Sequence, residues 1–412
     1  MVRELTYFEE GIRRIQGLCL YQKVNEDPVM TEFLNILKSI AARVDNKDMI
    51  AHYYKWLYKL TEKAEKEGYY GNIFNQYVID LFLKDENHFS LACENGVHVK
   101  GTSSYQMAYR DVEILRYILG FDIQNICGHI GAGEKVSDYR PMRPLDHSAI
   151  AQIEMANNAE AILEHLMWIY GNLGCGSYAS HKMLFLNENG IITGMETQDP
   201  VTFSDIIGNK TQKEALISNT EAFLAGAAAN NVLLVGPAGT GKSACVKALA
   251  NGYYQKKLRL IKIEMSDAYM LKDLLEKLAK RGKRFIIFLD DLVLDETDSR
   301  SVHLQSLLKG DVEGCPPNVL FYAASTQTVS GTTNTLIESS LADRFGLILE
   351  FPAPTQAQYQ DIVSALAQKK QIPISEDFLR EQALTWEANS KRMSGRKAKQ
   401  FIHNVIGELR KM

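Results

Sequence analysis

Residues 236–243 have the residue types and spacing with the clearest chemical meaning. They read Gly-Pro-Ala-Gly-Thr-Gly-Lys-Ser, a complete G-x-x-x-x-G-K-[ST] pattern that follows the apolar run NNVLLV and opens a helix-forming segment. This is the strand, loop and helix order that the motif requires. Its glycines let the backbone curl so that successive N–H groups converge on phosphate oxygens, and a helix N-terminus adds partial positive charge. The sequence therefore predicts a loop that binds a nucleoside triphosphate.

Each residue of this loop has an expected role. Lys242 should reach the β- and γ-phosphates, and the hydroxyl of Ser243 should bind Mg²⁺. The remaining contacts to the phosphates are expected from Gly236, Pro237, Ala238, Gly239, Thr240, Gly241 and Ala244.

A pair of carboxylates follows about 50 residues later, where the apolar run RFIIFL ends in Asp290 and Asp291. In α/β proteins, ligands bind at the carboxyl ends of the strands. We expect Asp290 to hold Mg²⁺ and Asp291 to polarise the attacking water. The alternative for both is a helix-capping or solvent-exposed acidic pair.

Alternating strands and helices position these residues. From residue 205, short apolar runs suited to strands buried on both faces alternate with helical segments, which predicts a parallel sheet with crossovers. Strands are expected at 231–235, 258–263, 284–289, 319–324 and 347–351, and three helices follow residue 354. Apolar residues at three- and four-residue spacing predict that residues 1–180 are mostly helical, with one long helix at about 146–170. We place the domains at 1–195, 196–352 and 353–412.

This combination resembles the AAA+ ATPases. The fold class implied is α/β: a P-loop NTPase parallel sheet with a C-terminal helical lid, preceded by a mostly α-helical N-terminal domain. The stretches FSDIIGNK, ANNVLLVG, RFIIFLDDL, LADRFGL and SGRK are further similar to one uncharacterised bacterial family of AAA+-type ATP-binding proteins, catalogued as a domain of unknown function. That resemblance covers about 200 residues at the C-terminal end and implies no particular substrate.

The resemblance implies roles for five further residues. Ile207 and Gly208 would lie beside the adenine, Thr326 would contact the γ-phosphate or the attacking water, and Arg396 would reach the γ-phosphate from the lid. Arg344 would enter the site of a neighbouring subunit as an arginine finger. Ser325 could replace Thr326 in its role. Asp291 departs from the glutamate common in hydrolytic relatives, which leaves its role as catalytic base open.

Charge is unevenly distributed along the chain. Residues 1–200 contain 19 Lys and Arg against 27 Asp and Glu, a net charge of −8, whereas residues 201–412 contain 27 against 23, a net charge of +4. A negatively charged domain is poorly suited to neutralising nucleic-acid phosphates. We therefore expect a protein client rather than a nucleic acid.

The environment of the protein is suggested by its cysteines and its hydropathy. Six cysteines are scattered without a C-x-x-C pair, which fits a reducing cytoplasm. Hydrophobic residues make up 46% of the chain and charged residues 23%, and no apolar run is long enough for a membrane span. We expect a cytoplasmic protein that does not enter a membrane.

The N-terminal half offers weaker candidates. Metal ligands could come from Cys127 with His129, or from His88, Cys93 and His98, but the paired spacings of zinc sites are missing. An aromatic group could form either a partner-binding surface or the core and rim of a helix: Tyr53, Tyr54, Trp56, Tyr58, Tyr69 and Tyr70.

Three functions are compatible with the sequence. The favoured one is an oligomeric, Mg²⁺-dependent ATPase that couples hydrolysis to remodelling of an unknown client protein. The second is a nucleotide-dependent binding module or switch with little hydrolysis, and the third is a DNA-remodelling ATPase. ATP rather than GTP is implied by the family resemblance.

Overall fold

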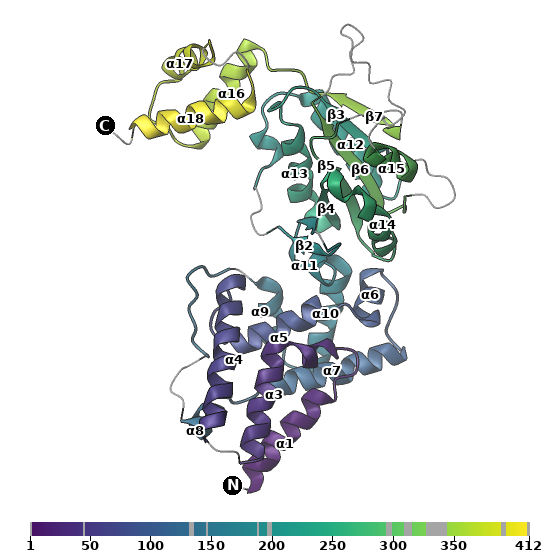
Figure 1. Ribbon diagram of the computed structural model, residues 1–412, viewed down its shortest axis with the longest axis vertical. Helices are drawn as coiled ribbons and strands as arrows, with labels where there is room; N and C mark the ends of the chain where they lie inside the picture. The colour runs from purple at the N-terminus through teal and green to yellow at the C-terminus, as the bar shows by residue number, and fades with distance from the viewer. Residues whose placement is uncertain are drawn as a thin grey trace. The chain divides into compact units, whose positions relative to one another are not determined.

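The chain divides into two compact units, Met1–Ser180 and His181–Met412 (Figure 1). The computed structural model describes residues 2–43, 46–131, 136–145, 147–187, 189–195, 200–293, 299–308, 315–326, 344–388 and 393–409. No helix within these ranges is long and apolar enough to cross a membrane.

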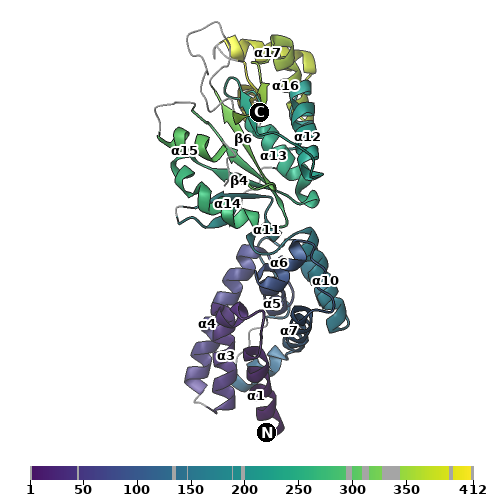
Figure 2. The same ribbon diagram turned by 90° about the vertical axis from the view of Figure 1, so that its right-hand side faces the viewer.

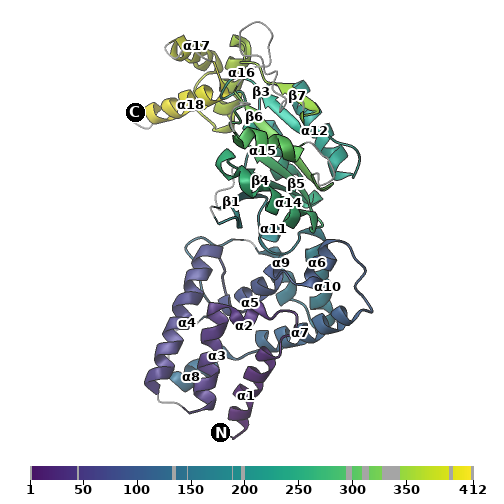
Figure 3. The same ribbon diagram turned by 45° about the vertical axis from the view of Figure 1, so that its right-hand side comes forward.

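The first unit is helical. Its helices are α1 (Val2–Gln16), α2 (Lys23–Glu26), α3 (Pro28–Ala41), α4 (Asn46–Glu67), α5 (Ile73–Lys84), α6 (His88–Glu94), α7 (Ser103–Leu119), α8 (Ile123–Ile130), α9 (Ser148–Glu154), α10 (Ala159–Asn172) and α11 (Ser177–Ser180). The helices α3 and α4 lie side by side (Figure 3). The long helix expected at about 146–170 is instead α9 and α10, because the side chain of Asn158 caps α10 by accepting a hydrogen bond from Ala161 N.

The core of this unit contains much of the aromatic group. Tyr53, Trp56 and Tyr69 are fully buried, whereas Tyr54, Tyr58 and Tyr70 are exposed to between 45% and 67%. For Tyr53, Tyr54, Trp56 and Tyr58 on α4, a helix with one apolar face accounts for this division, whereas Tyr69 and Tyr70 follow the end of that helix. Three of the six aromatic side chains, Tyr53, Trp56 and Tyr69, therefore belong to the core of this unit.

The second unit contains a seven-stranded sheet in the order β2-β1-β4-β5-β6-β3-β7. The strands are β1 (Met183–Leu186), β2 (Ile192–Gly194), β3 (Val232–Val235), β4 (Leu258–Ile263), β5 (Arg284–Leu289), β6 (Val319–Ser325) and β7 (Leu347–Glu350). All neighbouring pairs are parallel except β1 and β2, which form an antiparallel hairpin.

Helices cover both faces of the sheet. Figure 2 shows α12 (Lys210–Leu224) and α13 (Lys242–Tyr253) on one side and α14 (Leu271–Ala279) and α15 (Ser299–Leu308) on the other. This explains why the central strands are apolar at nearly every position: β3 is buried at all four residues and β6 at all seven. Short 3-10 turns occur at η1 (Phe203–Asp205), η2 (Tyr254–Lys256) and η3 (Met265–Met270).

Three helices complete this unit, α16 (Gln356–Lys369), α17 (Glu376–Ala388) and α18 (Gly395–Leu409). They have a small core of their own, in which Tyr359 and Val363 of α16 pack with Leu379 of α17 and with Phe401 and Ile402 of α18. The helical lid expected after the last strand is therefore present. The sequence also predicts a helix near residues 336–344, and this segment falls almost entirely outside the described residues.

The division between the units differs from the sequence-based boundary at 195/196. The hairpin of β1 and β2 belongs to the second unit, because β1 pairs in parallel with β4 and extends the sheet. The polar, proline-containing stretch at 196–204 favours a boundary there, but β1 pairs with a strand 77 positions later in the sequence, Met183 lying opposite Leu260, which leaves no local signal of where the hairpin belongs.

Candidate functional site

A cavity of about 310 Å³ lies where the P-loop, the segment before α12 and the lid helices meet. Its lining combines P-loop residues with apolar residues from other segments. Four of the residues singled out from the sequence, Gly236, Pro237, Asp290 and Arg344, are not among the lining residues. The residues of that set that do line the cavity are Ile207, Gly208, Ala238, Gly239, Thr240, Gly241, Lys242, Ser243, Ala244, Asp291, Thr326 and Arg396.

The P-loop depends on glycine for its shape. Gly236, Gly239 and Gly241 have φ values of 141°, 84° and 102°, in the region that side chains with a Cβ rarely occupy. A Cβ at Gly236 would also stand 2.1 Å from the carbonyl oxygen of Phe351, at the end of the neighbouring strand β7. The loop thus packs closely against the backbone at Phe351, which leads toward the lid helices.

Lys242 begins α13 and is 6% exposed. Its Nζ donates hydrogen bonds to the carbonyl oxygens of Gly236 at 2.6 Å and Pro237 at 2.9 Å. Burial lowers the pKa of this amine below its ordinary value, and nearby Arg396 lowers it further, while Asp291 and Asp290 oppose the shift. A phosphate would supply a full negative charge in place of two neutral carbonyls.

Ser243 and Asp290 meet at the start of α13 and the end of β5. The Ser243 hydroxyl donates a hydrogen bond of 2.7 Å to Oδ1 of the Asp290 carboxylate. A hydroxyl and a carboxylate are hard oxygen ligands, and Mg²⁺ is commonly bound by one or two such groups together with phosphate oxygens. The two side chains therefore fit the Mg²⁺ that the sequence implies.

Asp291 and Thr326 lie at the ends of the neighbouring strands β5 and β6. Asp291 is exposed in a left-handed conformation with φ of 55°, and both residues line the cavity. Ser325 is fully buried, and its carbonyl oxygen accepts a hydrogen bond from Gly236 N at 3.2 Å. Of the two hydroxyl residues, the geometry therefore brings Thr326 to the site.

The apolar side of the cavity combines three segments. Ile207 and Ile206 come from the segment before α12, Pro352 and Pro354 follow β7, and Ile362 and Leu366 lie one turn apart on α16. This surface suits the flat, largely apolar face of a nucleobase. The prolines and the lid residues were missed in the sequence, where only the i, i+4 spacing of Ile362 and Leu366 marks a shared helical face.

Hydrogen bonds fix these segments to the P-loop. The side-chain amide of Asn209 donates to Thr240 O at 3.0 Å, and Gly395 N, at the start of α18, donates to Gly239 O at 3.0 Å. Lys369 of α16 pairs with Asp205 beside the cavity. The pKa of Asp205 falls to about 2, mainly through the hydrogen bond from Lys369.

The chain matches one known protein family over more than half of its length. The sequence profile of a family described as "Protein of unknown function (DUF815)" matches residues 178–329 and 326–409. The chain belongs to this family. The matched region begins just before β1, in agreement with the unit boundary, and covers the sheet and the three C-terminal helices.

More distant proteins share parts of this region. The replication factor C large subunit of Methanococcus aeolicus is 36% identical over 106 residues, which are 24% of this chain; the match spans only 22% of the length of that curated relative. Among solved structures, the Thermotoga maritima RuvB Holliday junction branch migration motor has a TM-score of 0.34 and 18% identity, covering 50% of this chain and 72% of its own. C. elegans PCH-2 has a TM-score of 0.33 and 16% identity, covering 42% of this chain and 52% of its own. These likenesses are too distant to transfer an activity.

Two predicted arginines differ in position within the DUF815 region. Arg396, in the first turn of α18, is exposed and lines the cavity. Arg344, just before β7, is not among the lining residues. Its Nε is buried and has no hydrogen-bond partner among the residues that the structure describes. Arg344 thus contributes nothing to the cavity of its own chain.

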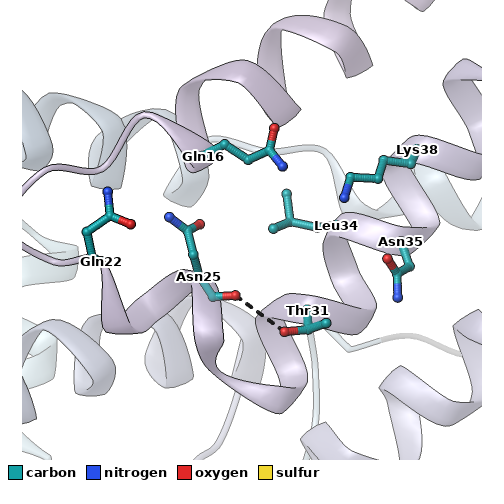
Figure 4. Close-up of a pocket in the computed structure, with 7 residues that line it drawn as sticks. All are labelled: Gln16, Gln22, Asn25, Thr31, Leu34, Asn35 and Lys38. Carbon is teal, nitrogen blue, oxygen red and sulfur yellow. Dashed lines mark hydrogen bonds between the residues drawn. The ribbon is translucent and has the colours of Figure 1, made fainter.

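A second cavity, of about 320 Å³, lies in the helical unit, outside the matched family region. Figure 4 shows its mainly polar lining, in which Thr31 donates a hydrogen bond of 3.3 Å to Asn25 O. The lining residues are Gln16, Gln22, Asn25, Thr31, Leu34, Asn35 and Lys38. With one charged side chain, this cavity lacks the combination of phosphate and base surfaces found at the P-loop.

Proposed function

We propose that this DUF815 protein binds ATP with Mg²⁺ at the P-loop cavity and hydrolyses it. The observation that carries the proposal is the joint placement of Lys242, the Ser243–Asp290 pair and an apolar surface around one cavity. This arrangement offers separate positions for phosphates, a metal ion and a base. ATP rather than GTP follows from the AAA+ resemblance.

In the proposed reaction the side chains act mainly by positioning and by stabilising charge. Lys242 would exchange the loop carbonyls for the terminal phosphates, and Ser243 and Asp290 would hold the metal ion. Mg²⁺ bound there would neutralise negative charge on the phosphate oxygens. Asp291 accepts a hydrogen bond from the attacking water and orients it, and Thr326 holds the γ-phosphate or that water. Arg396 stabilises the γ-phosphate from the lid.

We further propose that the active form is a homo-oligomer. Arg344 lies away from the cavity of its own chain, and its Nε is without a partner among the described residues. Insertion into the site of a neighbouring subunit would give this group an anionic partner and stabilise charge on the transferring phosphoryl group.

The proposed outcome of hydrolysis is remodelling of a protein client in the cytoplasm. Movement of the lid would be passed to the helical unit, whose negative charge favours a protein over a nucleic acid. Two similar proteins are named for replication and for Holliday junction branch migration, so salt-dependent DNA binding is the direct test of this choice. The six cysteines, all present as thiols, support a reducing compartment.

The main test is phosphate release with ATP and Mg²⁺ over a range of protein concentrations. Turnover that rises steeply with concentration and falls by about 100-fold or more in Arg344→Ala is expected, because loss of an arginine finger is known to cost on this scale. Turnover that is independent of concentration and insensitive to Arg344→Ala would contradict an oligomeric ATPase.

A second candidate is a nucleotide-dependent switch with little hydrolysis. It is favoured by Asp291, which is one methylene shorter than glutamate and holds a left-handed backbone conformation. Measurable ATP binding with negligible turnover in the assembled oligomer, unchanged in Asp291→Asn, would support this candidate over the ATPase.

A further inference from the structure

The lid presents two cations to the cavity, although the sequence pattern indicated one. Arg396 and Lys399 both lie on α18 and both line the cavity. Residues three positions apart share one face of a helix. Lys397, which lies between them in the sequence, is not among the lining residues. One face of α18 is therefore directed at the nucleotide site.

The direction of α18 places these two cations at different distances from the P-loop. The helix starts at the P-loop, where Gly395 N bonds Gly239 O, and each residue advances about 1.5 Å along the axis. Lys399 thus lies about 4.5 Å farther from this contact than Arg396. Consistently, Arg396 is close enough to Lys242 to lower the pKa of its amine, whereas Lys399 is not among the groups that shift it.

The electrostatics of this helical face suit an anion. Like charges at i and i+3 repel each other. Among the residues that the structure describes, neither Arg396 nor Lys399 forms an ion pair with a carboxylate. The same cavity is also lined by Ile362 and Leu366 of α16, which belong to the apolar surface suited to a nucleobase. A nucleotide with its terminal phosphates at Lys242 and its base against this surface would place its α-phosphate between the two.

We propose that Lys399 binds the α-phosphate of the nucleotide. This inference rests on the proposed function, since it assigns a ligand within the same site. The lid then holds the nucleotide at two points: Arg396 at the γ-phosphate, which only ATP has, and Lys399 at the α-phosphate, which ATP and ADP share. Lys399 thereby lets the lid remain on the nucleotide after the γ-phosphate is gone.

The test compares the full-length protein with its Lys399→Ala, Arg396→Ala and Lys397→Ala variants. Affinities for ATP, ADP and adenosine are measured by calorimetric titration and, for weak ligands, by displacement of a fluorescent ADP analogue. Lys399→Ala is expected to weaken ATP and ADP by a similar factor of about 5 to 20, the scale of one charge-assisted hydrogen bond, and to leave adenosine unchanged. Arg396→Ala should weaken ATP more than ADP, and Lys397→Ala should resemble the wild type.

Several results would overturn the assignment. Equal affinities of Lys399→Ala and Lys397→Ala for ADP would remove Lys399 from the site. A loss confined to ATP would move it to the γ-phosphate, and an equal loss for adenosine would move it to the ribose or base. Recovery of ADP affinity in Lys399→Arg distinguishes loss of charge from damage to the helix. If the wild type binds neither ATP nor ADP, this result contradicts the proposed function itself, and the assignment of Lys399 is contradicted as a consequence.

Discussion

In the helical unit, the buried carboxylate of Asp111 on α7 accepts hydrogen bonds from the backbone N–H groups of Cys19, Leu20 and Tyr21 at 2.7 to 3.2 Å. In the sheet unit, the buried amine of Lys242 donates to two carbonyls of its own loop. The first arrangement joins segments about 90 residues apart, and Asp111 is not among the residues that line either of the two cavities described above. The second borders a cavity and can exchange its partners for a stronger one.

This difference separates buried polar groups that hold the fold from those that hold a ligand. Burying a charge is costly unless charge-assisted hydrogen bonds compensate for it. Asp111 has its compensation within the chain. Among the described residues, the hydrogen-bond acceptors of the Lys242 amine are two neutral carbonyls, and burial lowers the pKa of this amine. A bound phosphate would supply the charged hydrogen-bond acceptor that the fold does not provide for Lys242.

The largest expected effect comes from Lys242→Met. Nucleotide affinity should fall by about 100-fold or more, since a charge-assisted contact to phosphate is lost. The free energy of unfolding without nucleotide should change by no more than about 1 kcal/mol, because the buried charge is removed along with its hydrogen bonds. Calorimetric titration and urea unfolding measure the two quantities. A large loss of stability without nucleotide would place Lys242 with Asp111 as a group that holds the fold.

Asp111→Ala should produce the opposite pattern. Three buried or partly buried N–H groups lose their acceptor, which should lower the free energy of unfolding of the helical unit by about 3 kcal/mol or more. Urea unfolding followed by circular dichroism measures this loss. Nucleotide affinity at low temperature should stay within about twofold of the wild type. Weaker nucleotide binding in a folded variant would show that the two units are energetically coupled.

A smaller, pH-dependent effect is expected at Glu32 in the helical unit. Burial raises the pKa of this carboxyl, but hydrogen bonds from Lys55, His52 and Lys59 outweigh that effect and lower its pKa from 4.5 to about 2. Because the folded-state pKa is depressed, the ionised form stabilises the fold above about pH 4.5, and this stabilisation is lost as the pH falls toward 2.

Glu32→Gln tests this dependence. The variant should be less stable than the wild type by about 1 kcal/mol at pH 7, a value reduced for the partial exposure of the lysines. The difference should vanish near pH 2. Thermal unfolding at several pH values measures it, with Glu62→Gln on the exposed face of α4 as the control. A difference that persists unchanged at low pH would rule out ionisation of Glu32 as its source.

The P-loop and the acidic strand end could be predicted because their signals are local. Eight consecutive residues specify the loop, and the placement of Asp290 follows from the apolar strand before it. The apolar surface could not be predicted, since Pro354 and Ile362 reach the cavity only through the packing of the lid. The break between α9 and α10 is also a local feature, yet the apolar periodicity across it concealed the cap at Asn158.

The hydrogen bond between Gly395 N and Gly239 O joins residues 156 positions apart in sequence. During synthesis, the P-loop and its strand leave the ribosome long before α18 exists. At about 5–20 residues per second, the interval is on the order of ten seconds. During that time the P-loop lacks its hydrogen bond to Gly395 of α18. The nascent chain therefore carries an unfinished form of the proposed nucleotide site, which the lid could enclose only once α18 has been made.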